Sequence, residues 1–120
     1  MKKILILGTA LLCGFLCRVA AQGVEFRDLT FGQALEQART ENKLVFMDCY
    51  TSWCGPCKNM LKNVFTLPEA GEFMNAHFVC VKYDMEKGEG IGLKKQFAVR
   101  AFPTFFICLL YTSDAADDLI

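Results

Sequence analysis

The sequence predicts one small α/β domain, with a central sheet flanked by helices. Apolar runs at Leu44–Tyr50, Phe78–Tyr83 and Phe105–Tyr111 have the composition of strands that are covered on both faces. Segments with helical spacing lie between these runs, and this alternation is typical of α/β folds with parallel strand pairing. The chain of 120 residues is long enough for one such domain, and its hydrophobic content of 53% supports a packed core.

The first predicted helix covers Phe31–Glu41. Its apolar positions recur at the spacing of one helix face: Phe31, Ala34, Leu35 and Ala38. Thr30 and Gln33 fit a capping box, in which each side chain accepts a free backbone amide at the helix start. Asn42 and Lys43 end this helix.

The strand Leu44–Tyr50 is interrupted only by Asp48. Burying a carboxylate is unfavourable unless it is hydrogen-bonded or neutral. Two interpretations stay open at this point. Asp48 is either a partly hydrated residue at the strand's end or a proton acceptor beside a thiol.

Further helices and a second strand follow. A helix is predicted over Lys58–Phe65, and Pro68 suits the first turn of another helix. We expect His77 to end that helix rather than to act as a base or metal ligand. After the strand Phe78–Tyr83, the glycine- and charge-rich segment Glu86–Gly92 is predicted to be a loop, and Leu93 and Phe97 mark a short helix.

The strongest chemical signal is the motif WCGPCK, with Cys54 and Cys57 at a strand-to-helix junction. Backbone amides and the positive end of the helix dipole favour a thiolate there, which is the form that attacks disulfides. Half of a zinc site would need a second Cys or His pair, and the sequence has no second CxxC and no HxxxH. A structural disulfide is the other alternative. A redox dithiol is favoured because Trp53, Gly55 and Pro56 fit a tight loop.

Residues 1–21 have the pattern of a secretory signal peptide. Lys2 and Lys3 precede a short apolar stretch, and small residues precede a cleavage site after Ala21. An uncleaved anchor and a lipoprotein signal are the alternatives. The expected compartment is therefore the periplasm or the extracellular space. The formal net charge is zero, without a basic patch, so nothing indicates nucleic acid.

Residues 108–120, CLLYTSDAADDLI, do not fit the predicted domain, because residues 113–118 have no glycine turn, no following strand and no amphipathic helix. They are similar to translated sequencing-adapter read-through, so we expect a non-native tail. The domain itself is then predicted to cover residues 22–107.

Three features together resemble the thioredoxin superfamily: WCGPCK, Asp48 six residues before its first cysteine, and Phe102-Pro103-Thr104. The resemblance runs from Leu29 to Ile107 and is strongest to the secreted thioredoxin-like proteins related to the C-terminal domain of the periplasmic interchange protein DsbD. It implies a thioredoxin-like fold with a mixed sheet. The family's last strand and helix are missing, so the fold looks truncated.

The resemblance also implies roles for the site residues. Cys54 would be the more exposed, attacking thiolate, Cys57 the resolving thiol, and Asp48 the acceptor of the proton of Cys57. Pro103 would be a cis-proline placed against the motif, with the preceding backbone contacting substrate. A second group would form the docking surface: Trp53, Gly55, Pro56 and Phe102. No cofactor and no metal are implied.

One departure from the family concerns a lysine that often pairs with the buried acid. The corresponding position here is expected to be Cys80, so Asp48 should be harder to ionise, because desolvation raises a carboxyl pKa. Cys49 and Cys80 are expected to be small buried hydrophobes, with a second redox pair as the alternative.

The Gly-Pro dipeptide inside the motif resembles the reducing members of the superfamily. The sequence therefore predicts a reductase of protein disulfides that works through a mixed disulfide with Cys54. Reduction in an oxidising compartment requires an electron donor, and a membrane-bound one is expected. The alternative function is a non-catalytic module that binds a client protein or a metal.

Overall fold

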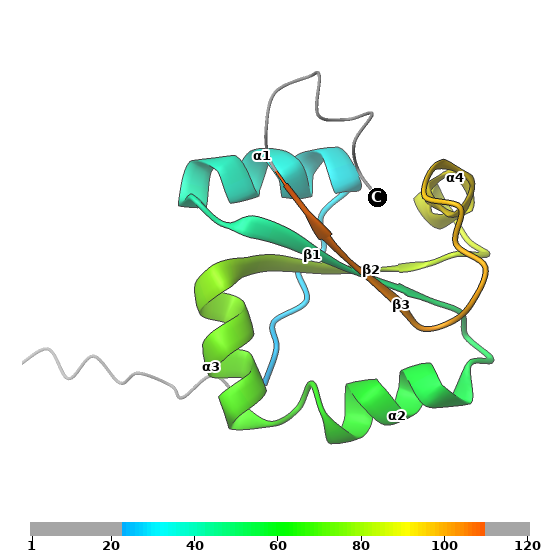
Figure 1. Ribbon diagram of the computed structural model, residues 1–120, viewed down its shortest axis with the longest axis horizontal. Helices are drawn as coiled ribbons and strands as arrows, with labels where there is room; N and C mark the ends of the chain where they lie inside the picture. Colours follow the sequence, from blue (N-terminus) through cyan, green and yellow to red (C-terminus); the bar gives the residue numbers. More distant parts are fainter. Residues whose placement is uncertain (1–22, 110–120) are drawn as a thin grey trace, which may run out of the picture.

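The computed structural model describes residues 23–109, which form a three-stranded sheet with helices on both faces. Figure 1 shows α1 and α4 on one face of the sheet and α2 and α3 on the other. The elements in chain order are α1 (Phe31–Glu41), β1 (Leu44–Tyr50), α2 (Gly55–Asn63), α3 (Pro68–His77), β2 (Phe78–Asp84), α4 (Glu89–Gln96) and β3 (Thr104–Cys108). None of the helices within 23–109 is long and apolar enough to cross a membrane.

The first helix and the first strand have the predicted bounds. Thr30 Oγ1 accepts the backbone N–H of Gln33 at 3.1 Å, and Gln33 Oε1 accepts that of Thr30 at 3.0 Å, so the capping box is confirmed. Asn42 ends α1 in the left-handed conformation, with φ at 54°. This sharp end leads directly into the central strand.

β1 is the central strand of the sheet, in the order β2-β1-β3. It pairs parallel with β2 and antiparallel with β3, so the mixed sheet implied by the resemblance is confirmed, and the parallel pairing expected from the alternation of elements holds for β2 alone. Composition indicates only that a strand is buried, whereas its direction depends on the end at which the chain re-enters the sheet. Here the chain after α4 re-enters the sheet at the end where β2 left it.

The helix α4 begins at Glu89, so the predicted loop over Glu86–Gly92 is wrong in its second half. Two glycines and the lack of an apolar period concealed this helix in the sequence. Tertiary contacts stabilise it. The Glu89 carboxylate accepts the backbone N–H of Phe31 at 3.0 and 3.2 Å, which ties the start of α4 to the start of α1.

Gly90→Ala is expected to lower the free energy of unfolding by about 1–3 kcal/mol, the usual range for overpacking. A Cβ at Gly90 would lie 1.8 Å from the carbonyl oxygen of Asp84, so α4 would have to move away from β2. Gly92→Ala is the matched control in the same helix, because nothing lies within 4 Å of its Cβ. Urea unfolding of the two variants checks this prediction, and equal midpoints would contradict it.

Buried side chains form a cluster on each face of the sheet. The cluster under α1 and α4 includes Val45, Met47 and Cys49, and the cluster under α2 and α3 includes Phe46 and Cys80. Cys49 and Cys80 are free and buried, as predicted. Because they belong to opposite faces, the alternative of a second redox pair between them is excluded.

The last strand differs from the prediction at both ends. It covers Thr104–Cys108 rather than Phe105–Tyr111. Cys108, which we placed in the tail, is its final residue, pairs with Val45 and is buried. The predicted signal peptide, most of the predicted tail and the expected truncation concern sequence outside the described residues.

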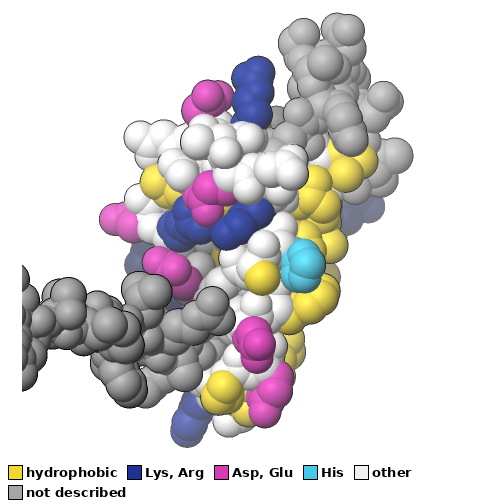
Figure 2. All heavy atoms as spheres, turned by 90° about the vertical axis from the view of Figure 1, so that its left-hand side faces the viewer, with side chains coloured by type: hydrophobic (Ala, Val, Ile, Leu, Met, Phe, Trp, Pro, Cys, Tyr) yellow, Lys and Arg dark blue, Asp and Glu magenta, His cyan; other side chains and the backbone are white. Residues whose placement is uncertain are grey.

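Apolar side chains remain exposed on α3 and β3, among them Phe73, Phe105 and Ile107. Figure 2 shows apolar side chains gathered beside the histidine, His77. His77 is the last residue of α3, as expected, and its ring lies 4.6 Å from that of Phe73.

Candidate active site

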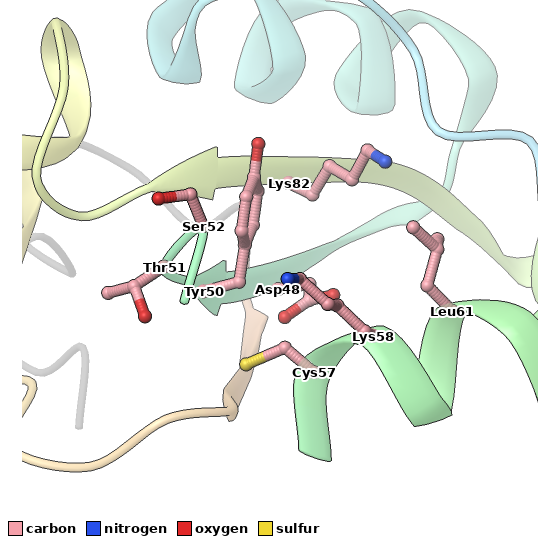
Figure 3. Close-up of a pocket in the computed structure, with 8 residues that line it drawn as sticks. All are labelled: Asp48, Tyr50, Thr51, Ser52, Cys57, Lys58, Leu61 and Lys82. Atoms are coloured by element: carbon pink, nitrogen blue, oxygen red, sulfur yellow. The ribbon is translucent and has the colours of Figure 1, made fainter. Parts of the chain in front are cut away.

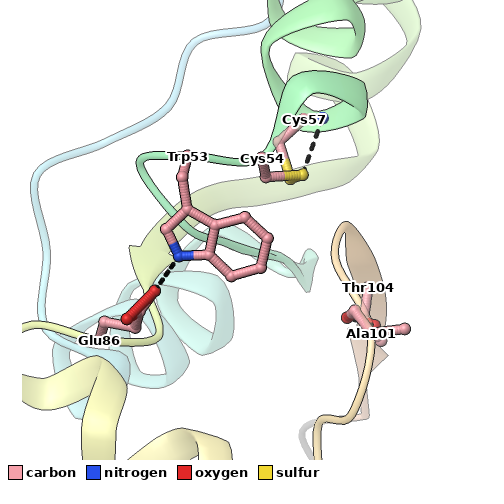
Figure 4. The surroundings of a disulfide bond; sticks show 6 residues. All are labelled: Trp53, Cys54, Cys57, Glu86, Ala101 and Thr104. Carbon is pink, nitrogen blue, oxygen red and sulfur yellow. Dashed lines mark hydrogen bonds between the residues drawn. A yellow bond between two sulfur atoms is a disulfide. The ribbon is translucent and has the colours of Figure 1, made fainter.

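Cys54 and Cys57 are joined by a disulfide at the start of α2. Cys54 is the N-cap residue, and its Sγ accepts the backbone N–H of Cys57 at 3.1 Å (Figure 4). Pro56 lies in the first turn, where its missing N–H leaves no hydrogen bond unmade. The predicted helix therefore begins three residues earlier than Lys58, and the motif itself forms its first turn.

The two cysteines differ in their hydrogen bonding rather than in their exposure. Cys54 is 3% exposed and Cys57 is 6% exposed, so the disulfide form does not present Cys54 as the more exposed residue. Only the Cys54 sulfur accepts an amide at the helix start. That amide and the helix dipole favour negative charge on Cys54 once the disulfide is opened.

Asp48 lies on β1 and is 3% exposed, so the interpretation as a partly hydrated strand end is wrong. Burial raises the pKa of its carboxyl to about 6, and the nearby charge of Lys82 partly offsets this rise. Its Oδ1 has no hydrogen-bond partner in the described part of the chain. An oxygen in this situation is available to accept a proton at neutral pH.

Asp48 and Cys57 line one cavity of about 110 Å³ between α2, β1 and β2. Figure 3 shows the side chains that converge there. The remaining lining residues are Tyr50, Thr51, Ser52, Lys58, Leu61 and Lys82. The predicted resolving cysteine and the predicted acid are thus brought together.

The sequence analysis expected Asp48 to lack a cationic neighbour, and this expectation is wrong. Asp48 pairs in the parallel register with Lys82, whereas Cys80 pairs with Phe46. The ammonium of Lys82 lies 5.5 Å from the ring of Phe26 and 5.9 Å from that of Tyr50. The acid therefore has a cationic neighbour, and its pKa is raised nonetheless because desolvation is the larger effect.

The peptide bond between Phe102 and Pro103 is cis, as the resemblance implied. Trp53, directly before Cys54, contacts the ring of Phe102 edge-on at 6.0 Å, so the proline loop lies beside the motif. Trp53 is 66% exposed, and its indole N–H donates to Glu86 (Figure 4). Sequence reasoning missed Glu86, because a charged residue after a strand gives no signal of such a contact.

Within residues 23–109, no group of three or more His, Cys, Asp and Glu side chains is arranged to hold a metal ion. The arrangement instead combines a dithiol pair, an acid with a raised pKa and an exposed aromatic surface. Such groups can exchange disulfides and transfer a proton to and from the second thiol.

The family model that matches this chain is described as "Thioredox_DsbH: Protein of unknown function, DUF255" and covers residues 10–101. Among curated proteins, Thioredoxin-2 of Pyricularia oryzae is 31% identical over 90 residues, which are 75% of this chain and 49% of that protein. Thioredoxin-1 of Drosophila melanogaster is 37% identical over 65 residues, 54% of this chain and 56% of that protein. The chain thus spans about half the length of these relatives.

Solved structures agree with this relationship. A Bacteroides thetaiotaomicron protein, described as a "putative disulphide-isomerase", is 49% identical, with a TM-score of 0.64 and coverage of 72% of both chains. A structure described as "DsbH Oxidoreductase" shares the fold, with 23% identity and a TM-score of 0.63 over 75% of this chain and 68% of that one. The closer likeness to DsbD remains a prediction. The match to most of the chain, together with the CxxC disulfide and the cis-proline loop, shows that this chain belongs to the DsbH-like (DUF255) family of the thioredoxin superfamily.

Proposed function

We propose that the protein is a thiol–disulfide oxidoreductase that reduces disulfides in other proteins. The observation that carries the proposal is the Cys54–Cys57 disulfide at a helix start, whose Cys57 lines one cavity with a buried acid with a pKa of about 6. Membership of the DsbH-like family supports it.

The reaction begins with the reduced dithiol. The Cys54 thiolate attacks a substrate disulfide, forming a mixed disulfide and releasing the first substrate thiolate. Asp48 then accepts the proton of Cys57, and the Cys57 thiolate attacks the Cys54 sulfur. The second substrate thiolate leaves, and the Cys54–Cys57 bond forms. Two electrons pass from the dithiol to the substrate, whose thiolates are protonated by solvent, and an external donor must reduce the protein again.

The docking surface comprises the residues around this bond. Trp53 and Phe102 offer exposed or half-exposed aromatic area next to the disulfide, and Pro103 holds the loop beside it. Gly55 and Pro56 are exposed at the first turn of α2, so a substrate chain can approach Cys54 closely there.

We propose that electrons flow from the protein to its substrates, because the Gly-Pro dipeptide of the motif resembles that of the reducing members of the superfamily. We also propose that residues 1–21 are a signal peptide that is cleaved after Ala21, so that the protein acts in a periplasm or outside the cell. Reduction in such an oxidising compartment requires an electron donor, for which we propose a membrane-bound protein. A reduction potential closer to about −120 mV, the value of a strong oxidant, than to about −270 mV would contradict this direction.

Insulin reduction by dithiothreitol tests the proposed catalysis. The full-length protein should accelerate precipitation of the insulin chains above the rate with dithiothreitol alone, because an activated thiolate attacks faster than the free reagent. A rate equal to that background would contradict the proposal and would favour the alternative of a non-catalytic module that binds a client.

A further inference from the structure

The Trp53 side of the site continues into an open hollow of about 570 Å³ between α4 and the loop that leads to Pro103. Its lining comes from the two residues that follow β2, from α4 and from residues 98–100. The lining includes Glu86, Ile91, Lys94, Lys95 and Arg100.

Two contacts connect this hollow to the disulfide. Glu86 accepts the indole N–H of Trp53, which directly precedes Cys54. The ammonium of Lys94 lies 5.8 Å from the ring of Phe102, which directly precedes Pro103. A substrate chain that reaches the disulfide across these aromatic rings therefore comes to the edge of the hollow.

The charge of the hollow is predominantly positive. Lys94, Lys95 and Arg100 are exposed and form no salt bridge with any residue in 23–109. Among residues 23–109, Glu86 is the sole acidic residue of the lining, and it accepts the indole N–H of Trp53. Glu89, the next acid along the chain, accepts the backbone N–H of Phe31 instead. The three cations thus have no acidic partner among the described residues.

We propose that this hollow binds an acidic segment of the substrate protein, next to the disulfide that is reduced. The inference rests on the proposed function and adds to it a class of preferred substrate. Exposed cations around a site speed encounter with an oppositely charged partner and select against other partners. Ile91, which is 48% exposed, adds an apolar contact for the stem of a bound side chain.

Two disulfide-bonded peptides test the proposal. They share one sequence, except that Asp and Glu in a four-residue flank of one are replaced by Asn and Gln in the other. The reduced protein should reduce the acidic peptide about 3- to 10-fold faster at low salt, the range that two or three exposed ion pairs provide. This preference should disappear near 1 M salt, where the screening length is about 3 Å.

The double variant Lys95→Glu/Arg100→Glu should bring the acidic-to-neutral rate ratio to one or below. Arg39→Glu/Lys62→Glu is the control, because it changes the net charge equally at exposed positions on α1 and α2 and should keep the ratio. Equal rates for the two peptides with the unchanged protein would overturn this inference alone. Reduction of neither peptide would instead overturn the proposed function. The salt dependence of the unchanged protein decides the matter even if the double variant does not fold.

Discussion

Cys54→Ser is expected to abolish insulin reduction, leaving only the rate of dithiothreitol itself. A serine hydroxyl can neither form the mixed disulfide nor ionise at neutral pH, so the loss should reach roughly three orders of magnitude, as for removal of other covalent nucleophiles. Cys54 is the N-cap of α2, and a serine there is also a preferred cap. The variant should therefore fold, and the loss can be assigned to the chemistry.

Cys80→Ser is the matched control for this loss. Cys80 is free and buried, and the carbonyl oxygens of Met74 and Phe78 lie 4.0 and 3.9 Å from its sulfur, so acceptors for the new hydroxyl are nearby. It belongs to the cluster under α2 and α3 rather than to the cavity that holds Cys57. The Cys80→Ser variant should retain its activity. Equal rates in Cys54→Ser and in the unchanged protein would contradict the proposed enzyme.

The features predicted well from the sequence are those in which local pattern and burial agree. α1 has a capping box and an apolar face, and β1 is apolar almost throughout, so their bounds needed no tertiary information. The motif was predicted for the same reason, because its chemistry depends on two cysteines at one helix start.

The features predicted poorly depend on contacts between distant segments. α4 is a helix largely because Glu89 caps the N-terminus of α1 and Gly90 fits against Asp84. Neither contact produces a hydrophobic periodicity that would indicate a helix in the sequence. The direction of β3 depends on the end at which the chain re-enters the sheet, and the composition of β3 does not indicate that end.

The same limit explains the error over the cation beside Asp48. A position transferred from the family pointed to Cys80, but the strand register places Lys82 opposite the acid. The expectation that desolvation raises the pKa of Asp48 held, although the expected lack of a cationic neighbour was wrong. Burial of Asp48 outweighs the attraction of Lys82, whose ammonium lies near the rings of Phe26 and Tyr50.

Asp48→Asn is expected to stabilise the oxidised protein at pH 7.5 but not at pH 4. The pKa of Asp48 is raised from 3.8 to about 6, so the folded protein holds this proton more tightly than the unfolded chain does. The stability associated with the proton is complete below pH 4 and is lost as the pH rises through 6. At about 1.4 kcal/mol for each pKa unit, the ionised carboxylate costs up to about 3 kcal/mol at pH 7.5.

Urea unfolding at both pH values measures this difference, with Asp28→Asn, an exposed position outside the site, as the control. Asparagine is neutral at every pH, so its advantage should shrink to nearly zero at pH 4. An equal advantage at both pH values would mean that the amide simply packs better, and the raised pKa would be contradicted.

The same variant should slow insulin reduction by about 100-fold at pH 7, at the lower end of what a general base contributes. Asp48 shares a cavity with Cys57 and its Oδ1 is unpartnered there, whereas an asparagine cannot take the proton of the resolving thiol. The loss should fall on the second step, so the mixed disulfide between Cys54 and the substrate should accumulate and be trapped by acid quenching. A slower reaction without this accumulation would mean that the acid acts on Cys54 instead. Ionisation of Asp48 therefore affects stability and catalysis in opposite senses. The buried carboxylate destabilises the fold, but it is also the base that accepts the proton of Cys57.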